Sequence, residues 1–340
     1  MPRQADCKSA TGCKPAPQNP LLLSYALGIA LLAPLSAQPL RLETTIPLSV
    51  RGRIDHMSPD VAGKRLFVAA LGNNSVEVVD VAAGKVTRSL KGFEEPQGVL
   101  FWPGGNRLYV ANGKTGNVNA LDGSTLAGIR TYQLDSDADN IRVEPAAKEV
   151  YVGYGEGALA VLQADAGERV GDVMLNSHPE SFQLEANGPR IFVNVPGAQR
   201  VAVVDRRTRT VSAKWGLSAE ENFPMALDEA NHRLFIGCRK PPKLIVLDTS
   251  TGKEVASADI VADTDDLFYD AALHRVYASG GAGAVTVIQQ NGPDSYAVGA
   301  SIPTAPKART SLFVPGWKQL IVAAPKDGKQ GARLLVFATN

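Results

Sequence analysis

Cysteine is scarce in this 340-residue chain, and neither sign of charge is in excess. Of three cysteines, Cys7 and Cys13 precede residue 37, and Cys238 stands alone in the rest of the sequence. A lone thiol forms no internal disulfide, so burial of apolar side chains has to stabilise the fold. The 35 lysines and arginines nearly balance 34 aspartates and glutamates, and the net charge of +1 calls for no polyanionic partner.

Common catalytic and cofactor motifs are also missing. The sequence contains no Gly-x-Ser-x-Gly elbow, no His-Glu-x-x-His motif, no Gly-x-x-x-x-Gly-Lys-Ser/Thr loop and no Cys-x-x-Cys-His attachment site. Histidine occurs four times, so general-base chemistry would depend mainly on His178 or on a carboxylate. These features favour a protein without enzymatic activity, and we predict no catalytic residue.

A long apolar run occurs at the amino terminus. Residues 21–35 are apolar almost throughout, follow three basic residues and precede the small residues Ser36 and Ala37. A basic region, a short apolar region and small residues in this order are typical of a secretory signal peptide. We expect cleavage near Ala37 and a secreted or periplasmic, monomeric mature chain without a transmembrane segment. An uncleaved membrane anchor is the alternative, against which Pro34 and the short run argue.

A six-residue apolar motif recurs seven times after this leader. Its second copy, Arg107–Asn112, reads RLYVAN and is apolar on consecutive residues, as expected of a strand that is buried on both faces. The copies begin at Arg65, Arg107, Glu149, Arg190, Arg233, Arg275 and Gln319. Successive copies lie 41 to 44 residues apart, which is typical of propeller blades of four strands.

Each repeat unit is predicted to contain four strands: an entry strand, the strand formed by the apolar motif, a third strand and a more polar outer strand. The seventh unit ends after its third strand, whereas residues 40–48 precede the first entry strand without a partner. We expect this amino-terminal strand to complete the last blade, because closure of the ring removes exposed strand edges. The sequence thus predicts an all-β, seven-bladed β-propeller over residues 38–340.

The ends of these strands resemble a known repeat. The motif Tyr109–Asn112 and the turns Asp80–Lys85 and Asp248–Lys253 are similar to the YVTN β-propeller repeat family, which includes YncE-like secreted bacterial proteins. Gln163 and Gln289 depart from it, since they replace the turn Asp in the third and sixth units. The resemblance implies a seven-bladed ring of WD40-like repeats. It implies little about chemistry, because similar members include binding proteins and lactonase-like enzymes.

The predicted ligand site is the face on which the entry strands begin, because the loops there converge on the central channel. Alignment of the units places one residue of each at an equivalent position: Arg53, Gln97, Asp139, Glu180, Phe223, Asp265 and Arg309, with His178 and Asp266 as close neighbours. The carboxylates can bind Ca²⁺, Mg²⁺ or a cationic group, and the arginines can bind an anionic end of a ligand. Solvated residues at the rim of a wet channel are the alternative.

We predict a non-enzymatic scaffold that binds a protein partner or a small ligand at this face. The first alternative is a lactonase-like hydrolase with a metal held by Asp139, Glu180 and Asp265. The second is weak binding of single-stranded nucleic acid by basic clusters at Arg206–Arg209, Arg239–Lys243 and Lys326–Arg333, although these clusters are scattered along the chain.

Two further groups of residues are predicted to have structural roles. His56 is expected to be an interior histidine of the first entry strand. Four aspartates that end third strands are expected to fix the following turns by accepting backbone hydrogen bonds: Asp80, Asp122, Asp205 and Asp248.

Overall fold

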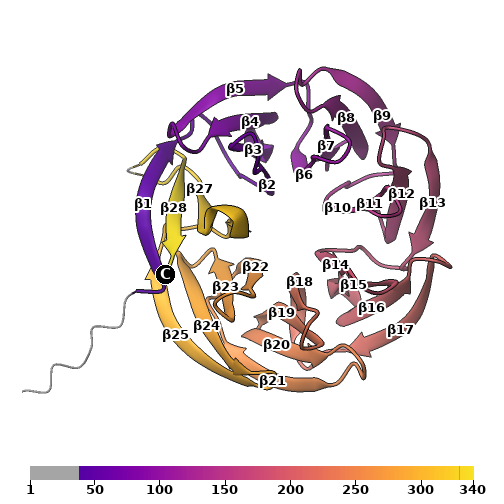
Figure 1. The fold of residues 1–340 in the computed structure, drawn as a ribbon, viewed down its shortest axis with the longest axis vertical. Helices are drawn as coiled ribbons and strands as arrows, with labels where there is room; N and C mark the ends of the chain where they lie inside the picture. Colours follow the sequence, from indigo (N-terminus) through magenta and orange to yellow (C-terminus); the bar gives the residue numbers. More distant parts are fainter. Residues whose placement is uncertain (1–37, 329) are drawn as a thin grey trace, which may run out of the picture. The chain divides into compact units, whose positions relative to one another are not determined.

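The computed structural model describes residues 38–328 and 330–340, and the predicted signal peptide lies outside these residues. The described chain forms seven four-stranded antiparallel sheets in a ring (Figure 1). Three short 3₁₀ turns accompany the strands: η1 (Leu71–Asn73), η2 (Pro196–Ala198) and η3 (Pro315–Trp317). The predicted seven-bladed β-propeller is therefore confirmed. Within the described ranges, no helix has the length and apolar character needed to cross a membrane.

Every blade consists of four strands ordered from the channel to the rim. The first strands are β2 (Met57–Asp60), β6 (Pro96–Trp102), β10 (Ile141–Glu144), β14 (Phe182–Leu184), β18 (Glu220–Asp228), β22 (Thr264–Asp270) and β26 (Thr310–Val314). The second strands are β3 (Arg65–Ala70), β7 (Arg107–Asn112), β11 (Glu149–Tyr154), β15 (Arg190–Val195), β19 (Arg233–Lys240), β23 (Arg275–Gly280) and β27 (Gln319–Ala324). The second strands begin at the same seven residues as the sequence repeat.

The remaining strands form the outer half of each blade. The third strands are β4 (Ser75–Asp80), β8 (Asn117–Asp122), β12 (Ala158–Gln163), β16 (Arg200–Asp205), β20 (Pro242–Asp248), β24 (Ala284–Gly292) and β28 (Arg333–Thr339). The outer strands are β5 (Lys85–Lys91), β9 (Gly128–Gln133), β13 (Arg169–Met174), β17 (Thr210–Gly216), β21 (Glu254–Asp259), β25 (Ser295–Pro303) and β1 (Leu40–Pro47).

The second strands carry the core. In β7 every residue after Arg107 is buried, and Tyr109 packs with Val150 and Leu162 of the next blade. Consecutive burial follows from the radial arrangement, because each face of a second strand meets a neighbouring blade. Each large apolar side chain buried in this way contributes about 1.5–3 kcal/mol.

The amino-terminal strand closes the ring. Strand β1 pairs antiparallel with β28, from Leu40 opposite Thr339 to Pro47 opposite Arg333, with one bulge (Figure 1). Leu40 and Ile46 are buried, whereas the residues between them are exposed. The last blade is therefore built from both ends of the described chain, as the sequence predicted.

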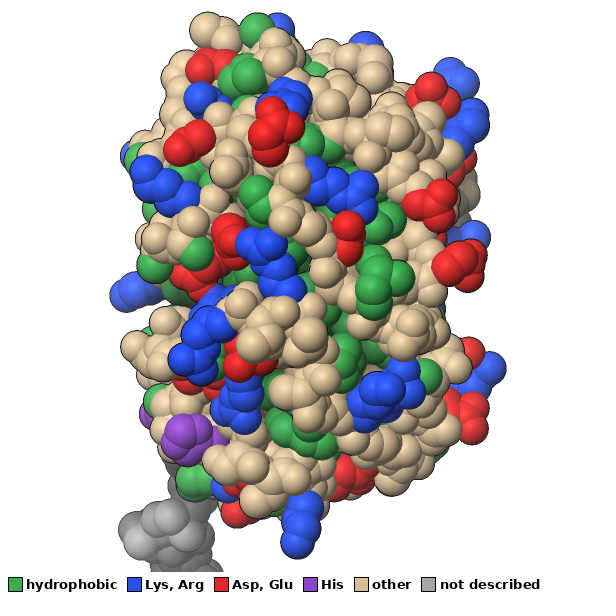
Figure 2. All heavy atoms as spheres, turned by 90° about the vertical axis from the view of Figure 1, so that its right-hand side faces the viewer, with side chains coloured by type: hydrophobic (Ala, Val, Ile, Leu, Met, Phe, Trp, Pro, Cys, Tyr) green, Lys and Arg blue, Asp and Glu red, His purple; other side chains and the backbone are tan. Residues whose placement is uncertain are grey.

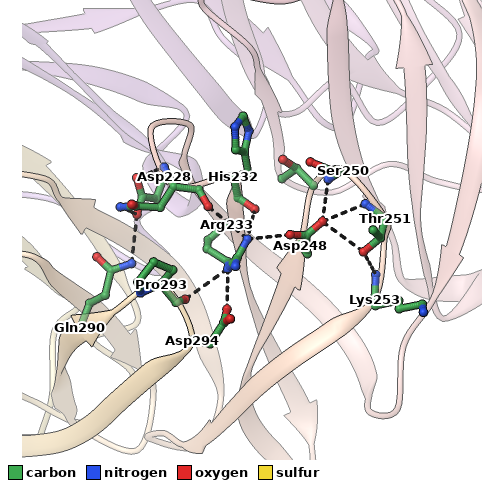
Figure 3. A network of polar contacts seen from close by, with 12 residues as sticks. Asp228, His232, Arg233, Asp248, Ser250, Thr251, Lys253, Gln290, Pro293 and Asp294 are labelled. Atoms are coloured by element: carbon green, nitrogen blue, oxygen red, sulfur yellow. Dashed lines mark hydrogen bonds and ion pairs between the residues drawn. The ribbon is translucent and has the colours of Figure 1, made fainter.

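The predicted turn-fixing role of the aspartates is also confirmed. Oδ1 of Asp248 accepts hydrogen bonds from the backbone N–H groups of Ser250 and Thr251, both at 2.9 Å (Figure 3). The same kind of contact is made by Asp80, Asp122 and Asp205. His232 and His274 lie in turns with φ of 55° and 52°, consistent with turn positions.

The arginine that begins most second strands joins its blade to the next one. Arg233 donates to Asp248 of its own blade at 2.7 Å, and to Asp294 at 2.7 Å and the Pro293 carbonyl at 3.2 Å in the following blade (Figure 3). Three other arginines donate to a carbonyl shortly after the third strand of the next blade: Arg65 to Gly123, Arg190 to Thr249 and Arg275 to Asn340. These contacts lie at the end of the strands opposite the predicted ligand face.

The outer rim shows no field of one charge. Seen from the side, basic and acidic side chains are interspersed with small apolar areas (Figure 2). Exposed large apolar side chains are scattered over separate strands and turns: Leu42, Val61, Ile129, Met174, Val255 and Val298. Cys238, the lone cysteine among the described residues, is buried and free. The rim therefore gives no indication of a preferred partner.

Candidate functional site at the channel mouth

The backbone register shows which residues occupy equivalent positions around the channel. The N–H groups of Asp55, Asp139 and Glu180 each donate to the carbonyl of the fifth residue of the adjacent second strand, at 2.7, 2.9 and 3.0 Å. In the sixth and seventh blades, Asp266 and Thr310 lie opposite the corresponding fifth residues, Ser279 and Ala323. In the first, third and fourth blades the residue opposite the fifth residue is the next one along, His56, Asn140 or Ser181, whose carbonyl accepts the N–H of that fifth residue. The residues equivalent to Asp55, Asp139 and Glu180 are therefore the ones directly before Asp266 and Thr310, namely Asp265 and Arg309. The register agrees with the sequence alignment for Asp139, Glu180, Asp265 and Arg309, and it differs in the first blade, where Asp55 occupies the position assigned to Arg53.

The shift in the first blade has a local cause. In the first blade, the loop before β2 turns at Gly52, whose φ is 70°, and the Arg53 carbonyl accepts a hydrogen bond from the Gly72 N–H at 2.9 Å. A Cβ on Gly72 would lie 2.7 Å from the Gly52 Cα, so this close approach requires glycine. An alignment by residue counting cannot detect this turn.

His56 lies at the centre of a cluster of carboxylates. Its Nε2 is 3.4 Å from Oδ1 of Asp139 and 3.9 Å from Oδ1 of Asp55, and its Nδ1 is 4.0 Å from Oδ1 of Asp266. Burial opposes protonation of His56, but the hydrogen bond with Asp139 and the charges of all three carboxylates outweigh it and raise the pKa to about 10. His56 is therefore a cation that holds three blades together.

The structure differs from the prediction that His56 is an interior residue of the first entry strand. The residue directly precedes β2 and lines the channel, and its side chain keeps 26% of its exposure. The His56 carbonyl accepts a hydrogen bond from the Ala69 N–H at 3.0 Å, so backbone pairing with β3 extends to His56.

The carboxyl groups around His56 differ in pKa. Burial raises the pKa of Asp55 to about 6 and that of Asp266 to about 7, although His56 opposes both shifts. For Asp139, burial is outweighed by the hydrogen bond and charge of His56 and by Arg53, so its pKa is lowered. Asp139 is therefore the principal ionised partner of His56.

A second layer of charges surrounds the opening. Asp265 accepts from Arg239 and, at 2.9 Å, from Nε of Arg309, while Nη1 of Arg309 donates to Asp263 at 3.0 Å. The guanidinium of Arg239 stacks on the Phe223 ring at 3.9 Å from its centroid. The ionic contacts hold Asp265 and Arg309 together, as expected for residues of one site.

Arg53 and Glu180 complete this layer. Nη2 of Arg53 lies 2.9 Å from Oδ2 of Asp55. The Glu180 side chain forms no hydrogen bond or ion pair with another described residue, and burial, followed by the charges of Asp139 and Asp265, raises its pKa to about 8. Glu180 is therefore mostly protonated at neutral pH and can donate as well as accept a hydrogen bond.

Gln97 and His178 form a separate group with Asp137. Gln97 donates to Oδ1 of Asp137 at 2.8 Å, and Nε2 of His178 is 3.7 Å from Oδ2 of the same carboxylate. The other ring nitrogen of His178 is 2.6 Å from the Gly155 carbonyl. These contacts link β6 of the second blade to the loops before β10 and β14 of the third and fourth blades.

The three predicted metal ligands do not fit a metal ion in this arrangement. Asp139 is directed to His56, and both oxygens of Asp265 are directed to arginines. Over residues 38–328 and 330–340, no group of three or more His, Cys, Asp or Glu side chains is arranged to hold a metal. Binding of Ca²⁺ or Mg²⁺ here would first require these ion pairs to separate.

Two hollows lie on the channel. The outer one, which we call the mouth pocket, has a volume of about 420 Å³ and is lined by Gly52, Arg53, Ile54, Asp263, Lys307, Arg309, Pro325 and Lys326. The inner one has a volume of about 300 Å³, and its polar lining includes His56, Arg142, Gln183, Asp266 and Ser311. Burial lowers the pKa of Arg142, whose guanidinium lies 5.5 Å from the Phe182 ring centroid.

Sequence reasoning missed several residues of this site. Asp55 and Arg142 were not singled out, and Asp263, Arg239 and Lys307 were not connected with the channel ligand. A partial signal existed for Asp55, because the segment Arg53–His56 alternates charged and apolar residues before a strand. For the others the signal was absent, because they come from strands and loops of different blades.

The basic clusters do not form one groove. Arg206 pairs with Glu144, and Arg209 pairs with Glu149 at 2.8 Å, at the end of the strands opposite the mouth pocket. Arg239 is held by Asp263 and Asp265, whereas Lys326 lines the mouth pocket. The observed placement therefore separates Arg206 and Arg209 from the other two clusters, whereas nucleic-acid binding would bring the three together.

Comparison with solved structures finds the same fold in proteins of low identity. A chain of the structure described as "Crystal Structure of Mitotic Checkpoint Complex" matches with a TM-score of 0.75 and 15% identity, over 93% of this chain and 99% of that chain. "Crystal structure of RRP9 WD40 repeats" matches with a TM-score of 0.75 and 10% identity, over 88% and 100%. "Kuenenia stuttgartiensis Hydrazine Synthase" matches with a TM-score of 0.70 and 16% identity, over 86% of this chain and 99% of that chain.

No protein-family model matches the chain, and no curated protein does so. At identities of 10–16%, the structural likeness concerns the fold alone. The class defined by the fold is a seven-bladed β-propeller with WD40-like structural neighbours.

Proposed function

We propose that the protein is a non-enzymatic scaffold that binds a small ligand or a protein partner at the channel mouth. The observation that carries the proposal is the convergence of ion-paired arginines from three blades, Arg53, Arg239 and Arg309, around one opening. Their carboxylate partners orient them before any ligand arrives, which lowers the entropy lost on binding. The likeness to WD40-repeat propellers is consistent with a scaffold.

The site chemistry favours binding over lactone hydrolysis. A metal-dependent hydrolase needs carboxylates that point at a common ion and a position for the attacking water. Here Asp139 and Asp265 are already neutralised by His56, Arg239 and Arg309. The site presents oriented donors and charges, which suits recognition of a polar ligand.

A hydrolysis assay tests this proposal. We expect the protein to hydrolyse sugar lactones no faster than a variant carrying Asp139→Asn, Glu180→Gln and Asp265→Asn, with or without added Ca²⁺ or Mg²⁺. Circular dichroism of the variant serves as the control for folding. Metal-dependent hydrolysis that the folded variant loses would overturn the scaffold and establish the hydrolase.

We further propose that this is a YVTN-type, YncE-like propeller exported with a cleaved signal peptide. The proposal is supported by the motif Tyr109–Asn112 and by the order of basic, apolar and small residues before Ala37. Expression in a bacterial host should yield a periplasmic chain whose intact mass corresponds to a start near Gln38. A chain of full mass retained with the membrane would instead indicate an uncleaved anchor.

A further inference from the structure

The mouth pocket is unusually rich in cations for a molecule of balanced charge. Four of its lining residues are basic, namely Arg53, Lys307, Arg309 and Lys326, and one is acidic, Asp263. Lys307 and Lys326 are exposed and form no ion pair with another residue of the described chain. They come from the loops before β26 and between β27 and β28, so the seventh blade supplies most of the positive charge.

The two arginines keep donors available for a ligand. Within the described residues, Arg53 uses Nη2 for Asp55, and Arg309 uses Nε and Nη1 for Asp265 and Asp263. A guanidinium has five N–H donors in a planar fork. The remaining donors can therefore bind an anion while the existing ion pairs stay intact, and those pairs hold the guanidinium groups in place.

The charges of the pocket do not cancel. The lining residues and the residues paired with them carry five positive charges, on Arg53, Arg239, Lys307, Arg309 and Lys326. They carry three negative charges, on Asp55, Asp263 and Asp265. Asp327, next to Lys326, pairs with Arg333 at 3.3 Å and leaves this balance unchanged. An excess of two positive charges remains, and it matches a ligand with two negative charges.

We infer that the mouth pocket binds a compact dianion, either a phosphate monoester or a dicarboxylate, with its charges directed to Arg53, Lys307, Arg309 and Lys326. This inference rests on the proposed scaffold function and names the ligand class of its site. The volume of about 420 Å³ accommodates a small metabolite rather than a polymer. The lysine ammonium groups are flexible point charges, whereas the planar guanidinium groups of the arginines are held in a fixed orientation by their ion pairs.

Calorimetric titration of the purified protein tests the inference, with inorganic phosphate and succinate as the two probes. We expect one binding site for at least one probe, with an affinity that falls between about 20 and 200 mM NaCl because salt screens exposed charges. The double variant K307A/K326A should bind about tenfold more weakly or worse, because it loses two charge-assisted contacts. Preference for phosphate or for succinate separates the two ligand types.

A matched control removes the same amount of charge elsewhere. Lys85 and Lys214 lie exposed on outer strands β5 and β17, and the variant K85A/K214A should bind the probe as the unmodified protein does. Equal melting temperatures for the two double variants would exclude a loss of folding as the cause.

The inference is overturned if neither probe binds, or if both double variants bind equally well. In that case, binding of neutral glucose or of cationic choline in the same titration would leave the scaffold function standing with a different ligand class. Loss of lactone hydrolysis in the triple variant described above would overturn the scaffold function itself. The two failures are therefore distinguishable.

Discussion

A chain that begins at residue 50 should melt about 10 °C or more below a chain that begins at residue 38. The truncation removes β1 and with it the outer strand of the last blade. Leu40, Ile46 and Leu48 are buried, and each loses about 1.5–3 kcal/mol of burial energy. Strand β28 also becomes an exposed edge, so aggregation on heating is expected in addition. Differential scanning calorimetry of the two chains measures the effect.

Point substitutions in β1 separate ring closure from a general effect of truncation. Ile46→Asp places a charge at a fully buried position, whereas Thr45→Asp places the same charge on the exposed face of the same strand. We expect the first to lower the melting temperature nearly as much as the truncation does, and the second to leave it almost unchanged. Equal melting temperatures for the chains that start at 38 and 50 would contradict closure by β1.

Replacement of His56 by asparagine should destabilise the protein by about 3 kcal/mol at pH 7. The substitution removes the cation that lies within 4.0 Å of Asp55, Asp139 and Asp266. Those carboxylates are buried, and an unpaired buried charge is costly. Thermal and urea unfolding of the two proteins at pH 7 measure the difference.

The effect of His56 should depend on pH in a defined direction. Its pKa rises from the ordinary value of 6.5 to about 10 on folding, so the folded state holds the proton more tightly. The contribution of His56 is therefore fully present below about pH 6.5 and is lost as the pH rises through 10. The stability gap between the native protein and His56→Asn should close as the pH approaches 10. A gap that stays constant from pH 7 to pH 10 would contradict the ionic role.

The raised pKa values of three carboxyl groups also make the native protein less stable as the pH rises. Asp55, Asp266 and Glu180, with pKa values of about 6, 7 and 8, bind protons more tightly in the folded state than in the unfolded state. Their contribution to stability therefore falls as the pH rises from the ordinary carboxyl pKa through these values.

The matched control for His56→Asn is His232→Asn, which replaces an exposed turn histidine by the same residue. This substitution should change neither the stability of the protein nor the dependence of that stability on pH.

The fold could be predicted from the sequence because its determinants are local and repeated. A strand buried on both faces needs a run of apolar residues, and Arg107–Asn112 shows such a run without reference to any partner. The turn aspartates act on backbone groups two or three residues away, so Asp248 could be interpreted within its own unit. Closure by β1 also followed, because the unpaired strand at one end of the chain matched the strand missing at the other.

The candidate site could be predicted only in part. Arg53, Asp139, Asp265, Asp266 and Arg309 were expected near the channel, and the structure connects them through ion pairs with one another or with residues beside them. Gln97 and His178 meet at Asp137 in a group of their own. No pattern in the sequence indicated that carboxylates expected to bind a metal would be neutralised by arginines and by His56.

The sequence by itself determined the number of blades, the extent of each second strand and the way in which the ring closes, because periodic burial and short turns specify these features. Only the tertiary structure decided which charges meet at the channel mouth. A loop turn at Gly52 shifts the register of the first blade by two residues. Such a shift changes which side chain faces the channel, and ion pairs between blades depend on side chains that are distant in sequence and meet only when the ring is complete.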